Sequence, residues 1–166
     1  MTDASLAPKR PSDSVTNMTE YVLPTHANVL GNVFGGQVLA WIDLCAAICA
    51  QRHMRRIAIT AGIDELSFER SIKVGQVVHI SARITAAFRT SIEIVALVEG
   101  EDPRTGERWP CVTAFVTFVG VDDDRKPVPV PPLLLESDEE KSLAEAAAER
   151  RAQRLAKRKK PIKSAS

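Results

Sequence analysis

The chain has 166 residues, of which 45% are hydrophobic and 26% are charged, and its formal net charge is +1. This composition is typical of one globular domain whose core needs no disulfide or metal, and the charge gives no overall attraction to nucleic acid or to a membrane. The apolar runs are shorter than the roughly 18 residues of a spanning helix, and no apolar stretch follows Lys9 and Arg10 as in a secretory signal. Three cysteines, an odd number, indicate free thiols in a reducing compartment. We expect a cytoplasmic protein that binds neither nucleic acid nor a membrane.

Composition divides the chain into three segments. Residues 1–14 are a polar lead that we expect to be flexible, residues 15–130 form the expected folded domain, and residues 131–166 form a charged tail. Four prolines in residues 127–132 mark the boundary between the domain and the tail, because proline continues neither a helix nor a central strand.

The expected elements of the domain are a strand near residues 19–23, a helix over residues 35–53 and four further strands. The helical run is apolar on nearly every side, and its length favours a buried helix over a strand. Strands joined by short turns pair mostly antiparallel. An antiparallel sheet that curls around the helix, with a second subunit covering the rest, is an α+β architecture. The later strands are expected where residues alternate with a period of two or are rich in β-branched and aromatic types, over residues 57–68, 77–86, 91–98 and 111–121.

The tail contains a helix signal of its own. Residues 137–140 (SDEE) have the form of a capping box, and alanine- and arginine-rich sequence with good helix propensity follows. Only Leu143, Ala147 and Leu155 suggest an apolar stripe. We therefore expect this helix to be mostly solvated, or docked weakly on the domain.

One residue of the apolar helix is out of place. Asp43 is the only carboxylate between Gln37 and Gln51, and a buried ionised carboxylate is costly unless it is paired. A purely structural helix would have leucine or alanine here, so the sequence predicts that Asp43 lines a pocket and takes part in chemistry. The alternative is a structural aspartate that caps a neighbouring loop or pairs with Arg52 or Arg70.

The loop before the helix, residues 26–36, contains two asparagines and three glycines. Glycines let a ligand approach the backbone N–H groups that a helix start leaves unpaired, and the helix dipole there favours negative charge developing on a carbonyl oxygen. A plain tight turn is the alternative. Gly36 and Asp43 are seven residues apart, roughly 10 Å of helix rise. One small reacting group contacts both more easily if they come from two copies of the chain, which indicates a site shared across a dimer.

The loop and helix together resemble the hotdog-fold acyl-CoA thioesterases of the YciA and brain-type acyl-CoA hydrolase group. The similarity begins in residues 28–36 (NVLGNVFGG), which are followed after six residues by Asp43. The proline stretch and the acidic-then-basic tail are also similar. Further matching segments are residues 60–64 (TAGID), 67–68 (SF), 74–78 (VGQVV), 89–94 (RTSIEI) and 114–119 (AFVTFV).

The resemblance implies a hotdog fold, in which a curled antiparallel sheet wraps around a long central helix, with a charged C-terminal helix added. It implies hydrolysis of the thioester between coenzyme A (CoA) and a fatty acyl chain, without a cofactor. By position, Asp43 matches the catalytic carboxylate, as general base or nucleophile, and Asn28 matches the asparagine that positions water or the carbonyl. Gly36, with Gly35 as second choice, matches the backbone N–H that stabilises the oxyanion. The implied assembly is a homohexamer, a trimer of dimers in which the dimer is the minimal catalytic unit.

The phosphates of CoA call for cations and hydrogen-bond donors around the mouth of the site. The family places its CoA-contacting turn at residues 89–91. Lys73 and the basic tail, with Arg154, Lys157 and Arg158, are candidate helpers, and a plain solvated helix is the alternative for the tail. The expected CoA-binding residues are Arg89, Thr90, Ser91, Arg70, Ser67 and Phe68.

Two other functions remain open from the residues. His26 lies close to Asn28 and could pair with Asp43, as in hotdog-fold dehydratases, which would make the protein an enoyl-CoA hydratase or dehydratase. A non-catalytic acyl-CoA sensor would keep the pocket and would not need Asp43. Release of free thiol from acyl-CoA distinguishes a hydrolase from both.

A metal site is a further interpretation of the helix. Cys45, Cys49 and His53 share one helical face, a spacing that could suggest zinc. A fourth ligand is missing, and buried free cysteines usually pack as small hydrophobic residues, so we expect no metal. His79 lies on the polar side of its strand, and we expect it in solvent.

Overall fold

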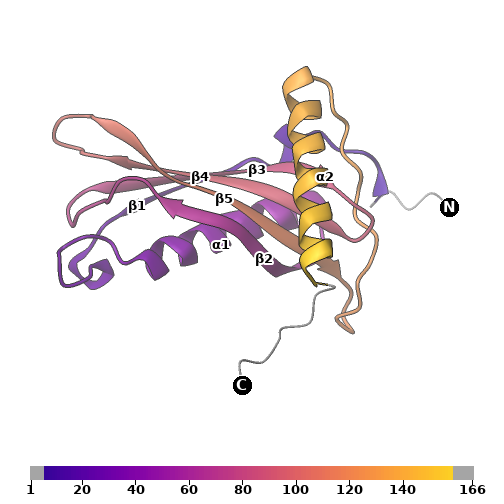
Figure 1. The fold of residues 1–166 in the computed structure, drawn as a ribbon, viewed down its shortest axis with the longest axis horizontal. Coiled ribbons are helices and arrows are strands. Elements are labelled where there is room, and N and C mark those ends of the chain that lie inside the picture. Colours follow the sequence, from indigo (N-terminus) through magenta and orange to yellow (C-terminus); the bar gives the residue numbers. More distant parts are fainter. Residues whose placement is uncertain (1–5, 159–166) are drawn as a thin grey trace.

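The computed structural model describes residues 6–158 (Figure 1). Residues 1–5 of the expected flexible lead and residues 159–166 of the tail lie outside the described residues. None of the described helices is long and apolar enough to cross a membrane. In chain order the elements are the short 3-10 helix η2 (Pro11–Ser14), β1 (Thr16–Tyr21), the 3-10 helix η3 (Pro24–His26), α1 (Gly35–Met54), β2 (Ile57–Phe68), β3 (Val77–Ala87), β4 (Ser91–Glu101), β5 (Arg108–Val121) and α2 (Asp138–Arg158).

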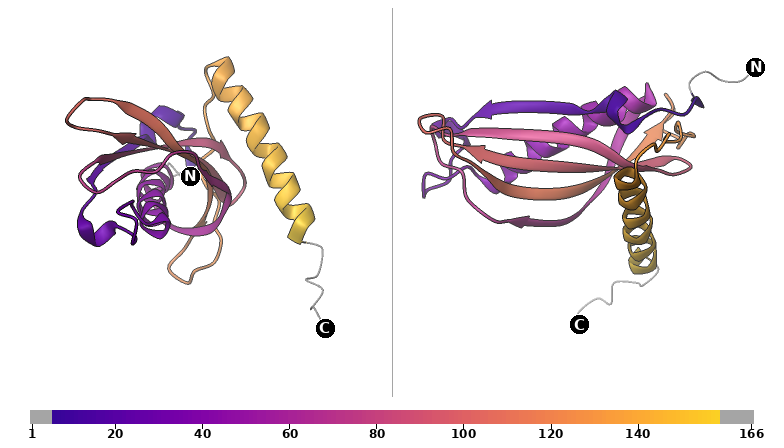
Figure 2. Two further views of the ribbon diagram at one scale, coloured as in Figure 1. Left: turned by 60° about the vertical axis from the view of Figure 1, so that its left-hand side comes forward. Right: turned by 90° about the horizontal axis from the view of Figure 1, so that it is seen from above.

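The five strands form one antiparallel sheet in the order β1-β3-β4-β5-β2. The left view of Figure 2 shows the sheet curling around α1, which is the hotdog arrangement expected from the sequence. Alternate side chains of a strand lie on the same face of the sheet. Ile80, Ala82 and Ile84 of β3 therefore all lie on the inner face, where they are buried against the helix. The expected α+β class and the expected order of strands and helix are confirmed.

One side of α1 remains open in the protomer. The helix buries Val38, Ile42 and Cys45 against the sheet, but Leu44 on the opposite side is 52% exposed. This open side is the part of the helix that we expected a second subunit to cover. The reason for the open side is geometric, because β2 is the last strand of the sheet and no strand of the described chain covers its outer edge.

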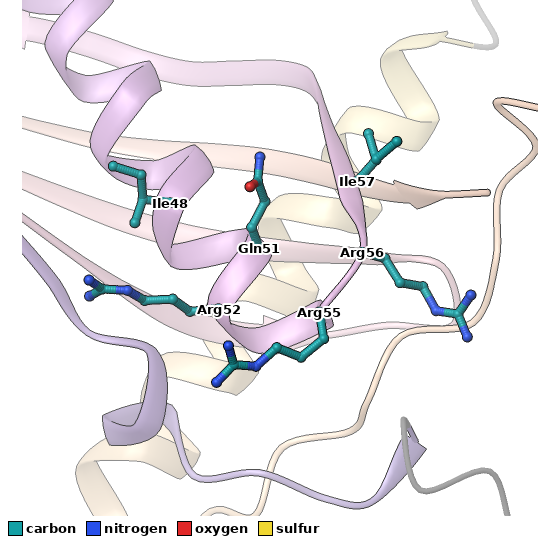
Figure 3. Close-up of a pocket in the computed structure, with 6 residues that line it drawn as sticks. All are labelled: Ile48, Gln51, Arg52, Arg55, Arg56 and Ile57. Carbon is teal, nitrogen blue, oxygen red and sulfur yellow. The ribbon is translucent and has the colours of Figure 1, made fainter. Parts of the chain in front are cut away.

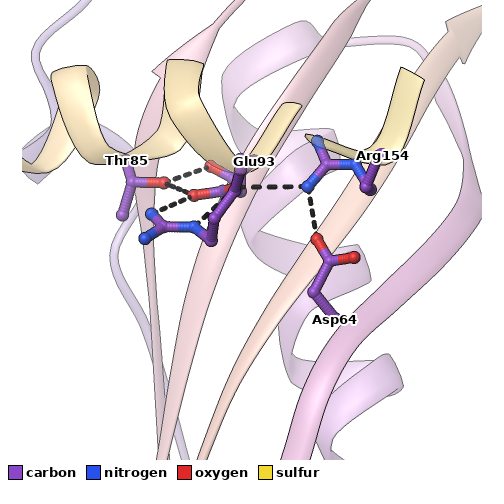
Figure 4. A network of polar contacts seen from close by, with 5 residues as sticks. Asp64, Thr85, Glu93 and Arg154 are labelled. Atoms are coloured by element: carbon purple, nitrogen blue, oxygen red, sulfur yellow. Dashed lines mark hydrogen bonds and ion pairs between the residues drawn. The ribbon is translucent and has the colours of Figure 1, made fainter. Parts of the chain in front are cut away.

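The C-terminal helix is docked more firmly than expected. Figure 1 shows α2 crossing the outer face of the sheet, and Ala147 of this helix is fully buried. Arg150 donates to Glu93 of β4 through Nε at 3.1 Å and through the terminal guanidinium nitrogen at 2.7 Å, and Glu93 is 0% exposed. Arg154 also contacts Glu93 and pairs with Asp64 of β2 (Figure 4). Of the two expectations, a docked helix is the one observed, because these cations neutralise carboxylates on the outer face of the sheet, while more than half of the described residues of α2 remain exposed.

The N-terminal lead is also held in place over its described part. The backbone N–H of Lys9 donates to the carbonyl of Pro132 at 3.1 Å, and the Arg10 guanidinium pairs with Glu136 at 2.7 Å. Residues 9–14 are thus held beside the segment that leads into α2, instead of being free.

Candidate active site

The carboxylate of Asp43 is half-buried on the side of α1 that faces β2. The Thr60 hydroxyl donates a hydrogen bond of 2.7 Å to Asp43 Oδ1. Thr60 belongs to β2 and lies opposite the buried Phe118, immediately before a register shift in the strand. A carboxylate positioned in this way by a hydroxyl donor has the chemistry of a general base or of a nucleophile.

One form of the structural alternative for Asp43 was an ion pair with Arg52 or Arg70. Arg52 instead donates to the Val15 carbonyl at 2.9 Å and to the Thr16 hydroxyl at 3.1 Å. Arg70 pairs with Glu107 at 2.9 Å. Both candidate arginines are thus engaged elsewhere, and Asp43 is not held by either of them.

Asn28 is placed by its own loop. Its side-chain oxygen accepts the backbone N–H groups of Leu30 at 3.0 Å and Asn32 at 3.2 Å. Because the oxygen is occupied in this way, the side-chain NH₂ group is left as the free end of the amide. Asn28 can therefore donate to a bound carbonyl oxygen or to water.

The start of α1 consists of two glycines, and the aromatic rings of Phe34 and Phe68 lie next to them. A Cβ at Gly36 would lie 2.4 Å from the Phe34 ring, so this ring position requires glycine at residue 36. A Cβ at Gly35 would lie 3.4 Å from Phe68, which places the end of β2 beside the helix start. The first N–H groups of a helix have no intrahelical acceptor, and they can donate to an oxyanion there.

The candidate catalytic residues form two groups within one protomer. Thr60 pairs with Phe118 and Phe68 pairs with Val112, six residues apart on β5, which is about 20 Å of strand. Asp43 contacts Thr60 near the start of β2, whereas Gly35 at the helix start lies beside Phe68 at the end of β2; along α1, Asp43 and Gly36 are seven residues apart, about 10 Å. Within one protomer, Asp43 with Thr60 and the start of α1 therefore form two groups of the candidate site.

The expected CoA-binding residues are divided in the same way. Ser91 pairs with Val119 of β5, so the turn at residues 89–91 lies at the Asp43 end, while Ser67 and Phe68 lie at the other end. The Arg70 guanidinium lies 4.2 Å from the centre of the Trp109 ring, besides its pair with Glu107. The Arg70 side chain is therefore already occupied within the protomer.

The three histidines are engaged with groups other than Asp43. His26 Nδ1 accepts the backbone N–H of Leu23 at 3.2 Å, so the pair needed for dehydratase chemistry does not form within the protomer. His53 contacts the Pro131 carbonyl at 2.8 Å. His79 contacts Glu101, and this contact lowers the pKa of the Glu101 carboxyl. The expectation that His79 is simply in solvent was therefore wrong.

The cysteines pack as buried side chains. Burial raises the pKa of Cys45 to about 11 and that of Cys49 to about 12, so both thiols stay protonated at neutral pH. Within residues 6–158, no cluster of three histidine, cysteine or acidic side chains could hold a metal ion.

A cavity of about 560 Å³ lies at the C-terminal end of α1 (Figure 3). Arg52, Arg55 and Arg56 line it, and cations are favoured at this end of a helix. Figure 3 shows Arg56 directed away from the other two arginines. The lining has no carboxylate or nucleophile, so this cavity has no group comparable to the Asp43 carboxylate.

Comparison with known proteins agrees with this fold. Residues 30–107 match the profile of the thioesterase superfamily. An acyl-CoA thioester hydrolase of Bacillus subtilis, YkhA, is 37% identical over 132 residues, which are 80% of this chain and 77% of that protein. The acetyl-coenzyme A thioesterase of Rattus norvegicus is 36% identical over 138 residues, 83% of this chain and 25% of the rat protein. This chain thus spans about a quarter of the length of that mammalian relative.

Solved structures extend the similarity to three dimensions. A hexameric acyl-CoA thioesterase matches with a TM-score of 0.88 and 37% identity, covering 93% of this chain and 99% of that chain. An acyl-CoA hydrolase from Staphylococcus aureus, in complex with butyryl-CoA, CoA and CoA disulfide, matches with a TM-score of 0.83 and 32% identity over 90% of this chain and 92% of that one. The chain belongs to the thioesterase superfamily, among its acyl-CoA thioester hydrolases.

Thr60 is the site residue that the sequence did not single out. Its segment was recognised as similar to the family, but no rule of spacing connects a threonine on β2 to an aspartate on α1. The only available signal was strand alternation, which directs residue 60 towards the helix. The partner atom becomes visible only once β2 is packed beside α1.

Replacing Thr60 with valine should lower kcat about tenfold, because a hydrogen bond to a charged group contributes about 1.5–3 kcal/mol. Steady-state release of free thiol from acyl-CoA measures the effect. Thr60→Ser keeps the hydroxyl and should retain most of the rate. A loss of rate in Thr60→Ser with the rate retained in Thr60→Val would show that the methyl group, not the hydroxyl, is what the site needs.

Proposed function

We propose that the protein hydrolyses fatty acyl-CoA to a free fatty acid and CoA. The observation that carries the proposal is the Asp43 carboxylate, half-buried on an apolar helix with the Thr60 hydroxyl as its donor. The names of the relatives support it, as does the Staphylococcus aureus hydrolase in complex with butyryl-CoA. That hydrolase has also been solved as alanine variants of an aspartate, a threonine and an asparagine, the three residue types of this site.

Each group has a role in the proposed reaction. Asp43 takes a proton from water as the water oxygen attacks the thioester carbon; direct attack by the carboxylate, giving a mixed anhydride, is the second route. The Asn28 NH₂ group and the Gly36 N–H hold the carbonyl oxygen while it carries negative charge. The carbon–sulfur bond then breaks, and the thiolate leaves as CoA. This scheme needs no cofactor.

A dimer would complete the site. The free edge of β2 carries Ile57, Ile59 and Ile63, which are all exposed in the protomer, and exposed apolar edge strands pair readily with another strand. If two β2 edges pair antiparallel about a two-fold axis, the start of one strand lies beside the end of the other. The partner's helix start, which lies against the end of β2, would then be adjacent to Asp43 and Thr60.

We accordingly propose a homodimer with two equivalent shared sites as the catalytic unit. Solved relatives include hexameric thioesterases, one of them from Yersinia pestis, and we propose a trimer of such dimers here. Relatives from rat, mouse and human are named cytosolic. Together with three buried free thiols, these names support a cytoplasmic location.

Mixed dimers test the shared site. Asn28→Ala and Asp43→Ala subunits should each be inactive alone, but a mixed dimer keeps one intact pair of residues. After random exchange of subunits, activity should return to about a quarter of the wild-type rate, since half of the dimers are mixed and each has one of two sites. If both residues of a site came from one protomer, mixing would restore nothing.

The assay also separates the other functions. Thiol release from acyl-CoA by the wild-type protein supports the hydrolase. Hydration of enoyl-CoA without thiol release would indicate the dehydratase class, and binding of acyl-CoA without turnover would indicate a sensor.

A further inference from the structure

The segment that leads from β5 to α2 packs against the C-terminal end of α1. We call residues 127–135 the strap. Val130 of the strap is only 6% exposed, and its backbone N–H donates to the Arg89 carbonyl at 3.1 Å. A Cβ at Gly120 of β5 would lie 3.0 Å from Val130 and equally close to Met54 of α1, so both side chains pack on the same spot of the strand. The strap therefore covers one end of the core.

His53, in the last turn of α1, binds the strap directly. Its Nε2 lies 2.8 Å from the Pro131 carbonyl, and because a carbonyl only accepts, Nε2 carries the proton. The residue is 0% exposed. Its Nδ1 is buried and has no hydrogen-bond partner among residues 6–158. The ring is therefore the neutral Nε2–H form, and a second proton on Nδ1 would find no acceptor.

Lys9 joins the same contact from the N-terminal lead. Its ammonium donates to the backbone carbonyl of His53 at 2.5 Å. Its backbone N–H donates to the Pro132 carbonyl at 3.1 Å, and its carbonyl accepts the Leu134 N–H at 2.9 Å. One lysine thus holds the end of α1 and the strap together, and it places a positive charge near the imidazole.

The surroundings of His53 disfavour a charged imidazole. Burial lowers the pKa of His53, and the bond to the Pro131 carbonyl opposes this effect. From the N-terminal lead, the Lys9 cation lowers the pKa and the Asp13 carboxylate raises it. The strap itself has no titratable side chain.

The helix supplies no acid that could stabilise the imidazolium. Arg52 and Arg55, on either side of His53 in the sequence, are cations. Cys49, one turn earlier, has its pKa raised by burial to about 12 and stays a neutral thiol. Asp13 is thus the only carboxylate found to favour a proton on His53 among the described residues.

We propose that the strap is a pH-sensitive latch, which His53 holds closed as a neutral imidazole and releases when it is protonated. In the closed state the Nδ1–H of an imidazolium has no acceptor, whereas in a locally opened state water solvates both N–H groups. The open state therefore binds the proton more strongly. The closed state becomes less stable as the pH falls below about 6.5, the ordinary pKa of histidine, until the lower pKa of the closed state is reached. The ion pairs of α2 with Glu93 do not involve the strap, so α2 should stay docked.

Hydrogen exchange in the full-length protein measures the opening of the strap. The backbone N–H groups of Val128, Val130 and Leu134 donate to carbonyls outside the strap, and they exchange when the strap opens. After correction for the intrinsic exchange rate, their protection should fall by up to about tenfold for each pH unit below about 6.5, the limit for one proton. Protection of β4 and α2 should stay constant over the same range.

Two histidine variants make the test specific to His53. His53→Gln keeps an Nε2–H donor for the Pro131 carbonyl but cannot be protonated. Its strap should be protected as in the wild type at neutral pH, and this protection should not fall with pH. His79→Gln is the matched control, because His79 contacts Thr19 and Glu101 at a different place on the sheet. Its strap should open with the wild-type pH dependence.

Two results would overturn the proposal. One is the absence of any fall in strap protection in the wild-type protein, and the other is a fall in His53→Gln as large as in the wild type. Exchange of the imidazole C2–H, followed by mass spectrometry, gives the pKa of His53 in the wild-type protein and is independent of whether the variant folds. This pKa should lie below about 6.5, and a value at or above it would equally contradict the latch.

Discussion

Asp43→Ala should lower kcat for hydrolysis of acyl-CoA by about 10²- to 10⁴-fold, the contribution typical of a positioned general base. The carboxylate has no role in holding CoA in the proposed mechanism, so affinity for CoA should remain close to that of the wild-type protein. Thiol release measures the first quantity and calorimetric titration with CoA measures the second.

Two further variants make the result specific to the carboxylate. Asp43→Asn keeps the size of the side chain and should be as inactive as the alanine variant, because an amide neither takes the proton from water nor attacks the thioester. Asp123→Asn removes one negative charge from an exposed loop and should leave the rate unchanged. Turnover at the wild-type rate after neutralisation of Asp43 would remove the basis of the mechanism.

The second large effect concerns stability and the attachment of α2. Arg150→Met should lower the free energy of unfolding by about 3 kcal/mol, because it leaves the fully buried Glu93 with an incomplete partner set. Thr85 and Arg154 retain their contacts with Glu93 at 2.8 Å and 3.5 Å (Figure 4), so the loss should fall at the lower end of the range for broken buried pairs. Urea unfolding measures it.

A neighbouring ion pair provides the matched control. Arg83 of β3 pairs with Glu139 of α2 at 2.9 Å, but the side chains are 36% and 71% exposed, and exposed pairs contribute about 0–1 kcal/mol. Arg83→Met should therefore be nearly neutral. Adding Glu93→Gln to Arg150→Met should recover part of the lost stability, since it removes the unpaired charge. Equal losses from Arg83→Met and Arg150→Met would show that burial of Glu93 is not the cause.

Local pattern was sufficient for the elements of the sheet and for α1. Strand β2 has the expected bounds, and α1 ends one residue beyond the expected range. Ser137 and Glu140 form the expected capping box, with hydrogen bonds of 3.1 and 3.2 Å. These features depend on neighbours within a few residues, which is why period and capping residues predict them.

Side-chain partners from distant segments were not predictable in this way. Alternation over residues 91–98 puts Glu93 on the side of its strand opposite the buried Ile92 and Ile94. The same side is covered by α2, whose Arg150 is 57 residues away in sequence. The weak apolar stripe of α2 suggested a solvated helix. Hydrophobic periodicity contains no information about ion pairs, which also hold this helix on the sheet.

The sequence by itself determined the fold class, the buried helix with one acid in it and the glycine-containing loop at its start. Each of these follows from the chemistry of successive residues and from the periods of helix and strand. Only the tertiary structure decided that Thr60 is the partner of Asp43 and that α2 lies on the sheet. The physical reason is that these relations depend on how the sheet curls and where its edge ends, and residues far apart in the chain come together only when the whole domain has packed.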